Sequence, residues 1–522
     1  MSRVRYLVSC LIGVVLLSPA FARAKKETQS AQKLPHDIEA ILDDPDGAHG
    51  FWGIYAVSLD SKKPIFALNP DKLFTPASNA KLFTTAAVFG LIGPDYRFNT
   101  TVETLGALDK YGRLDADLVL VGRGDPNLSG RGLPYNMRTE RKAPPIQVLQ
   151  ELADQLVQHG LKYIDGDVVA DDSYFVWQRY DEGWSQDDLA REWGAPVSAL
   201  TVNDNVIFVN IMPAARPGER AFLNITPFPE YYKIDNRVMT TPQGSGPRTV
   251  SINREPGSNQ LTFYGNIPED DPGFSEALAI EDPADFTARL FRQLLEERGV
   301  TIYGRSRTRH TELASTQTIS VTSMASGGGD ATRPPNPSPL VLASYQSQPV
   351  AEDLRVINKV SQNLHAELML RLLGKEKGTS GSIESGLEVL RGFLVNAGVK
   401  PDQFVFYDGS GLSREDLVTP QAVVTLLSYC RQQPWGQSYE DTLPVAAVDG
   451  SLAERFRNTP AAGKVKAKTG SLAHVYSLAG YATTESGDHI AFSVVTNNNN
   501  MPTKKALDTI DRIVVRLVDD EK

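Results

Sequence analysis

Residues 75–85 read Thr75-Pro-Ala-Ser-Asn-Ala-Lys-Leu-Phe-Thr-Thr85 and open a long apolar stretch. Thr75 is a favoured helix N-cap, Pro76 suits the first helical position, and Gly90 is typical of a helix end. We therefore predict a helix between Pro76 and Gly90. Because this segment is apolar on nearly every side beyond its first turn, we expect the helix to be buried.

The first turn of this helix carries Ser78 and Lys81. Residues three apart share one helix face, so the hydroxyl and the amine can touch. A serine needs a base to become a nucleophile, and a lysine in apolar surroundings loses its charge easily enough to act as one. The pair alone equally fits a capping serine and a surface lysine, and Ser30-Ala-Gln-Lys33 in the polar leader shows that such pairs occur by chance.

Two later motifs follow in the chain. Ser361-Gln-Asn363 lies between helices that we predict at 351–359 and 365–373, and Lys468-Thr-Gly-Ser471 lies on the first strand of a predicted meander. Alone, the first is a common helix-cap sequence and the second fits an ordinary edge strand. Together with Ser78 and Lys81, however, they occur in the order that active-site-serine enzymes acting on β-lactams and D-Ala-D-Ala use.

Beyond these motifs, the chain divides into an outer part, formed by its two end regions, and a middle part. The outer part alternates strands and helices, whereas the middle, from about 98 to 310, has short β-like runs separated by turns and two helices. For the outer part we predict a hairpin at 53–59 and 64–68, helices at 382–397, 419–431 and 503–518, and strands at 464–470, 473–483 and 489–496. Residues 313–338 are rich in Ser, Thr, Gly and Pro and are predicted to be a linker.

The N-terminus has the pattern of a secretory signal peptide. Arg3 and Arg5 precede an apolar run from Tyr6 to Leu17, and small residues follow up to Ala24. The alternative, a membrane anchor, is disfavoured because about 12 apolar residues are short of the roughly 20 that span a bilayer. Cleavage would follow Ala22 or Ala24, so the mature chain keeps a single cysteine and forms no internal disulfide.

Composition excludes some classes of partner. The chain has 522 residues and a net charge of −10. Loss of residues 1–24 would remove three arginines and make the net charge more negative. Without runs of basic residues, nucleic acid and anionic lipid surfaces are poor partners. We see no His-Glu-x-x-His pattern, and we predict no metal and no cofactor.

Further segments make the sequence similar to one family, the class C low-molecular-mass penicillin-binding proteins, which are serine D-alanyl-D-alanine carboxypeptidases and endopeptidases. The resemblance covers most of the mature length. Besides 75–85, the matching segments are Gly124-Asp-Pro126, Gly166-Asp-Val-Val-Ala-Asp-Asp172, Gly194-Ala-Pro-Val-Ser-Ala-Leu200, Asn203-Asp-Asn205, Asp408-Gly-Ser-Gly-Leu-Ser413 and Ala467-Lys-Thr-Gly-Ser471.

The resemblance implies a fold and a domain plan. We expect an α/β (α+β) penicillin-binding/β-lactamase-like transpeptidase domain with inserted β-rich domains. After a signal peptide at 1–24, the catalytic domain would comprise 34–100 and 340–522. Inserted domain II would comprise 101–195 and 285–339, and inserted domain III 196–284.

The resemblance also implies roles for the motif residues. Ser78 would attack the carbonyl of the penultimate D-Ala, with Lys81 as base and Ser361 passing a proton to the leaving amine. The substrate would be held by the side chains or backbone of Asn363, Lys468, Thr469, Gly470 and Ser471. Penicillins would acylate the same serine, and the natural partners would be peptidoglycan stem peptides in the periplasm.

Two features depart from the family pattern, and two other functions stay open. The 313–338 linker is longer than in the family, and Gln362 replaces the Asp or Asn often found inside the second motif, but neither change removes a reacting group.

A β-lactamase would use the same chemistry, although class A β-lactamases have no room for two inserted domains between Ser78 and Ser361. A catalytically silent wall-binding protein is disfavoured because all three motifs are intact. The balance between trimming terminal D-Ala and cutting cross-links, and the oligomeric state, are not predicted.

Overall fold

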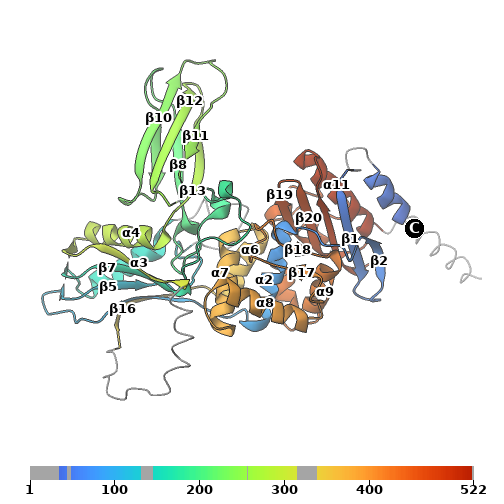
Figure 1. Cartoon of the computed structure of the whole chain (residues 1–522), viewed down its shortest axis with the longest axis horizontal. Helices are drawn as coiled ribbons and strands as arrows, with labels where there is room; N and C mark the ends of the chain where they lie inside the picture. Colours follow the sequence, from blue (N-terminus) through green and yellow to red (C-terminus); the bar gives the residue numbers. More distant parts are fainter. Residues whose placement is uncertain (1–33, 44–48, 131–144, 256, 314–337, 520–522) are drawn as a thin grey trace, which may run out of the picture.

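The computed structural model describes residues 34–43, 49–130, 145–255, 257–313 and 338–519. Figure 1 shows three parts: a mixed sheet-and-helix body that holds both ends of the described chain, a second body beside it, and a group of long strands that projects from the second. The predicted signal peptide and residues 314–337 of the predicted linker lie outside the described residues.

An antiparallel five-stranded sheet forms the centre of the first body, in the order β19-β20-β21-β1-β2. The strands are β1 (Phe51–Ser58), β2 (Pro64–Leu68), β19 (Val465–Leu472), β20 (Val475–Thr483) and β21 (His489–Asn497). β1 pairs with β21 along its whole length, from Phe51 opposite Asn497 to Ser58 opposite Ile490. The first and last parts of the chain therefore share one sheet.

Helices cover both faces of this sheet. α11 (Thr503–Val518) packs with Ile510, Ile513 and Val514 against one face, and the segment 34–42 lies in the same core. The other face carries the larger core, built on the buried α2 (Ala80–Leu91). Around α2 lie α6 (Val350–Lys359), α7 (Asn363–Lys377), α8 (Ile383–Asn396), α9 (Pro420–Arg431) and α10 (Gly436–Glu440), with the small pair β17 (Phe404–Val405) and β18 (Leu417–Val418).

The second body contains two more sheets and two helices around a separate core. Its larger sheet has the order β15-β7-β5-β3-β16 and its smaller one β14-β6-β4. The elements are β3 (Asn99–Thr104), β4 (Arg113–Leu114), β5 (Leu118–Val121), α3 (Gln147–Gln158), β6 (Tyr163–Ile164), β7 (Val168–Val176), α4 (Pro283–Glu297), β14 (Thr301–Ile302), β15 (Ser306–Thr311) and β16 (Leu340–Gln346). β16 pairs with β3, so we propose that the inserted domain ends at Gln346 and the second catalytic segment begins after it.

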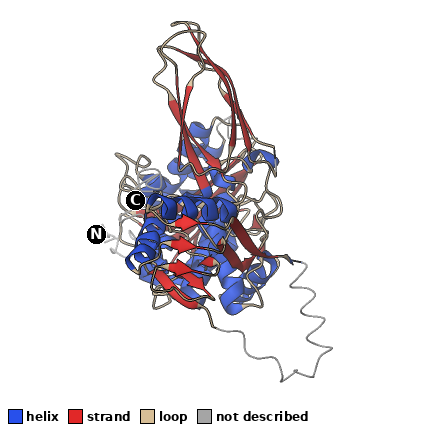
Figure 2. Cartoon of the chain, turned by 90° about the vertical axis from the view of Figure 1, so that its left-hand side faces the viewer, coloured by secondary structure: helices blue, strands red, loops and turns tan. Residues whose placement is uncertain are grey.

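The projecting strands form two three-stranded sheets, which extend lengthwise at the top of Figure 2. They are β8 (Val206–Met212), β9 (Phe222–Thr226), β10 (Lys233–Thr241), β11 (Ser251–Asn253), β12 (Gln260–Pro268) and β13 (Phe274–Ala279). The mixed α/β fold with inserted β-rich sheets agrees with the sequence-based expectation. None of the helices in the described ranges is long and apolar enough to cross a membrane.

The start of the buried helix differs from the prediction. A 3₁₀ turn, η1 (Ala77–Asn79), precedes α2, and neither begins with a side-chain cap. The Thr75 backbone N–H instead donates to Asn497 Oδ1 at 2.8 Å. Contact with the end of β21 thus replaces local capping, and Ala77 takes a positive φ of 50°. The helix also continues through Gly90, which is packed against Phe393.

Candidate active site

Ser78 and Lys81 meet where η1 passes into α2. Lys81 Nζ lies 2.9 Å from Ser78 Oγ, although Ser78 is on the 3₁₀ turn and Lys81 is on the first turn of the α-helix. The Lys81 side chain has no exposed area. A hydroxyl next to a buried amine is the pairing that an activated serine nucleophile requires.

Polar atoms from two other segments hold the Lys81 amine. It donates to Asn363 Oδ1 and to the Ser410 carbonyl, each at 2.6 Å. Burial lowers the pKa of Lys81 to about 7, against the opposing pull of the carboxylates of Asp408, Glu367 and Asp416. Near neutral pH, a large fraction of Lys81 is therefore uncharged and able to accept a proton.

Ser361 and Lys468 form a second hydroxyl–amine pair. Ser361 lies between α6 and α7 with a φ of 64°, and its Oγ accepts a hydrogen bond from Lys468 Nζ at 2.8 Å. Lys468 also donates to the Thr469 carbonyl at 2.8 Å. Burial, aided by the charge of Lys81, holds the pKa of Lys468 well below its ordinary value.

Gly470 allows β19 to run beside η1. A Cβ at Gly470 would lie 2.8 Å from the Pro76 carbonyl oxygen and 3.1 Å from the Ser78 nitrogen, and would also meet the Ser477 hydroxyl. Glycine is therefore required at this close approach. Next to it, Thr469 Oγ1 bonds Ser451 Oγ at 2.8 Å, and Ser471 is exposed on the same strand.

The structure thus brings together all three motifs on one side of the five-stranded sheet. The site consists of two hydroxyl–amine pairs, Ser78 with Lys81 and Ser361 with Lys468, together with Gly470 on β19 and the side-chain amide of Asn363. This arrangement is typical of acyl transfer through serine. Residues 34–325 and 329–518 match the model of the D-Ala-D-Ala carboxypeptidase 3 (S13) family. The chain belongs to this family.

Individual relatives agree with this assignment. The chain is 32% identical to a D-alanyl-D-alanine carboxypeptidase of Actinomadura sp. (strain R39) over 98% of this chain and 89% of that one. It is 24% identical to the D-alanyl-D-alanine carboxypeptidase DacB of Haemophilus influenzae, over 93% and 91%. The crystal structure of penicillin binding protein 4 from Haemophilus influenzae superposes with a TM-score of 0.74 at 23% identity, covering 93% of this chain and 98% of that one.

The predicted identity and activity are therefore confirmed at the level of the family. The chain is a serine-type D-Ala-D-Ala carboxypeptidase/endopeptidase of the class C penicillin-binding group. Within the described part of the chain, no cluster of His, Cys, Asp or Glu could hold a metal ion.

The sequence analysis missed the loop that supports Lys81. Asp408 accepts hydrogen bonds from the backbone N–H groups of Ser410, Gly411 and Ser413, at 3.1, 2.6 and 2.7 Å, which fixes the loop that carries the Ser410 carbonyl. Both carboxylate oxygens of Glu367 accept from the Gly409 N–H. The sequence analysis gave the segment 408–413 only as a match to the family, because its partner Lys81 is far away in the chain.

An inserted segment also takes part in the site, without any sequence signal. Asn363 Nδ2 donates to the Trp193 carbonyl at 2.8 Å, and Trp184 Nε1 donates to Asp408 Oδ2 at 2.9 Å. On the helix side, buried Arg371 forms ion pairs with Glu367 and with Asp181 of the inserted segment. The segment 181–193 is therefore attached at both ends to the first body, which carries the catalytic motifs.

Proposed function

We propose that Ser78 is the nucleophile that attacks the carbonyl of the penultimate D-Ala of peptidoglycan stem peptides. The observation that carries this proposal is the 2.9 Å approach of Ser78 Oγ to the buried amine of Lys81. With a pKa of about 7, the uncharged Lys81 accepts the hydroxyl proton as the new C–O bond forms.

The second pair completes the proton path. The tetrahedral intermediate collapses with cleavage of the C–N bond, and the leaving amine needs a proton. Ser361 relays to that amine the proton that Lys81 took from Ser78, so that Ser361 and Lys81 both return to their starting forms, and Lys468 Nζ holds the Ser361 hydroxyl at 2.8 Å. The departing product is the terminal D-Ala or, in a cross-link, the amine of the neighbouring peptide. Water then hydrolyses the acyl-enzyme, regenerating Ser78.

Binding groups surround this path. Asn363 would hold the substrate amide, and Lys468 with Thr469 would bind the terminal carboxylate. The backbone N–H groups of Ser78 and Ser471 would form the oxyanion hole, where such donors contribute about 3 kcal/mol each to the transition state. Gly470 lets β19 lie close against η1, which holds this strand beside Ser78. We further propose that the protein is exported to the periplasm, where its substrate lies, and that penicillins acylate Ser78.

Intact-mass measurement tests the nucleophile. Wild-type protein incubated with benzylpenicillin should gain one long-lived adduct of the mass of the drug, and Ser78→Ala should gain none. Ser486→Ala, in the remote turn before β21, serves as the matched control and should behave as wild type. An adduct on Ser78→Ala would refute the assignment.

The same assay separates the two other functions. If penicillin is consumed while no adduct accumulates, the protein is a β-lactamase. If penicillin stays intact and no protein gains mass, the wall-binding alternative replaces the enzymatic one. Release of D-Ala from a pentapeptide, compared with cleavage of a cross-linked dimer, then measures the balance between the two peptidase activities.

A further inference from the structure

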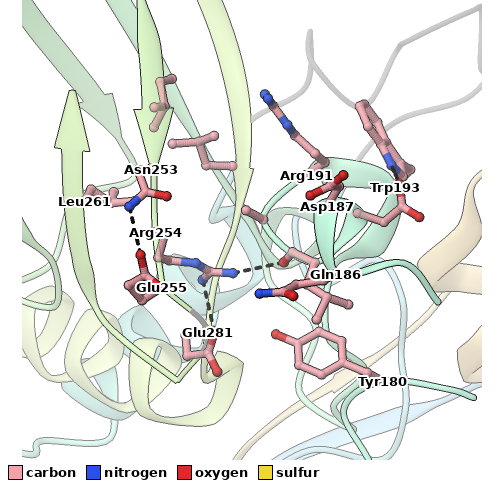
Figure 3. Close-up of a pocket in the computed structure, with 15 residues that line it drawn as sticks. Tyr180, Gln186, Asp187, Arg191, Trp193, Asn253, Arg254, Glu255, Leu261 and Glu281 are labelled. Carbon is pink, nitrogen blue, oxygen red and sulfur yellow. Dashed lines mark hydrogen bonds and ion pairs between the residues drawn. The ribbon is translucent and has the colours of Figure 1, made fainter. Parts of the chain in front are cut away.

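A cavity lies between the projecting strands and the segment 180–193, and one of its lining residues, Trp193, is hydrogen-bonded to Asn363 of the active site. Its volume is about 640 Å³, within the range of sites for small ligands. Figure 3 shows Asn253 and Glu255 on the side of the strands, and Gln186, Arg191 and Trp193 across the cavity from them. The two walls thus come from different inserted segments.

Trp193 connects this cavity with the active site. Its carbonyl accepts from Asn363 Nδ2 at 2.8 Å, and Asn363 Oδ1 bonds Lys81. Trp193 lines both the large cavity and a small one of about 110 Å³ that is also lined by Ser361 and Asn363. A ligand that extends from the catalytic centre past Trp193 therefore reaches the large cavity.

Arg254 forms the floor of the large cavity through several contacts. The Arg254 side chain, 3% exposed, donates to the carbonyls of Leu189 and Ala279 at 2.9 and 2.8 Å. It also lies 3.5 Å from the Glu281 carboxylate. These contacts join the projecting strands to the segment 180–193 and hold the two walls of the cavity together.

The walls combine a flat aromatic ring with hydrogen-bonding side chains. The Trp193 residue is 45% exposed, yet its Nε1 donates to Asp188 Oδ1 at 2.7 Å, which holds the indole in place. An indole presents a broad apolar face while its polar edge stays satisfied. Next to it, Gln186, Arg191 and Asn253 offer amide and guanidinium groups.

The charges of the lining disfavour an anionic ligand. Asp187, Asp188, Glu255 and Glu281 outnumber the two guanidinium groups of Arg191 and Arg254. Burying an anion among these carboxylates would be unfavourable. A neutral ligand with hydroxyl and amide groups and an apolar ring face fits best, which is the chemistry of an N-acetylated sugar.

We propose that this cavity is a subsite for the glycan of peptidoglycan, the amino sugars to which the stem peptide is attached. The proposal rests on the proposed function, because it requires the D-Ala carbonyl to lie at Ser78. An extended peptide of four residues spans up to about 14 Å. Because Trp193 lines both the large cavity and the small one at Ser361 and Asn363, the proposal places the sugar at the far end of this peptide beyond Trp193, beside Arg191 and Asn253.

Paired substrates test this subsite. We would measure kcat/KM for D-Ala release from a synthetic stem pentapeptide, with and without the N-acetylglucosaminyl-N-acetylmuramyl disaccharide. Wild type should prefer the disaccharide-bearing substrate by about tenfold, the effect of one or two net hydrogen bonds. The double variant Arg191→Ala/Asn253→Ala should lose this preference, with kcat/KM on the bare pentapeptide and the penicillin acylation rate unchanged.

Arg237→Ala is the matched control, because Arg237 lies on β10 and is exposed, outside the cavity lining. It should keep the wild-type preference. The subsite is refuted if wild type shows no preference, or if the preference survives in the double variant. Loss of activity on the bare pentapeptide in the double variant would also refute it, by showing that the cavity binds peptide. Failure of the proposed function is distinguishable, since wild type would then release no D-Ala from either substrate.

Discussion

The protonation of Lys81 should govern the rate at which the enzyme is acylated. A lysine with the ordinary pKa of 10.5 is uncharged in roughly one molecule in 3,000 at pH 7. With a pKa of about 7, half of the Lys81 side chains are uncharged at that pH. Burial therefore increases the population of the reactive form about a thousandfold.

The assay is the second-order rate constant of acylation by a fluorescent penicillin between pH 5 and 9. The rate should rise about tenfold per pH unit below pH 6 and level off above about pH 7.5. Asp408→Asn removes the carboxylate that most favours the charged amine, so the midpoint should move to lower pH. Glu454→Gln is the control: this carboxylate is 68% exposed and is not among the groups that shift the pKa of Lys81, so the midpoint should stay where it is in wild type.

Two results would refute this reasoning. A rate that still rises steeply beyond pH 9 would mean that Lys81 keeps an ordinary pKa. A midpoint that moves to higher pH in Asp408→Asn would mean that the Asp408 charge does not act on Lys81 in the way the geometry requires.

Three further predictions concern stability and packing. Between pH 7 and 10.5 the Lys81 amine is protonated in the unfolded chain but not in the folded protein. In urea unfolding, the free energy of unfolding of wild type relative to Lys81→Met should therefore rise with pH, by up to about 1.4 kcal/mol per pH unit. A difference between the two proteins that does not change with pH would contradict this. Arg371→Met leaves two buried carboxyls without their partner and should lower the free energy of unfolding in urea by about 3–5 kcal/mol. Arg455→Met, which removes a more exposed ion pair, should lower it by less, and equal losses would contradict this. Gly470→Val should slow penicillin acylation at least tenfold through contact with Pro76 and Ser78, while Gly392→Ala, which has open space around it, should not; equal rates would contradict the close approach.

Much of the catalytic body could be predicted from local patterns. The helix expected at 503–518 is observed with the same bounds, because its apolar side recurs at helical spacing and packs on the sheet. Ser78 and Lys81 could be paired because three residues on a helical turn bring two side chains together. Ser361 and Lys468 were predicted as parts of one site only through the order of the motifs, and their 2.8 Å contact required the structure.

Contacts between distant segments could not be predicted. Thr75 is a residue type that often caps helices, but its backbone N–H donates to Asn497 at the end of β21, and the helix begins with a 3₁₀ turn instead. Arg371 and Asp181 are ordinary charged residues in the sequence, and only the fold buries them together. Trp193 approaches the site through a backbone carbonyl, a group that every residue carries and that no residue type reveals.

The pairing of β1 with β21 has a consequence for when the enzyme becomes active. β21 joins β1 and β2 to β19 and β20, so the catalytic sheet closes only after residue 497 has been made. A chain interrupted earlier holds Ser78 and Lys81 but lacks the strand that brings Lys468 alongside them. Pairing between such distant segments is slow and occurs late in folding. A chain that ends before β21 should therefore show no peptidase activity, even though it already carries Ser78 and Lys81.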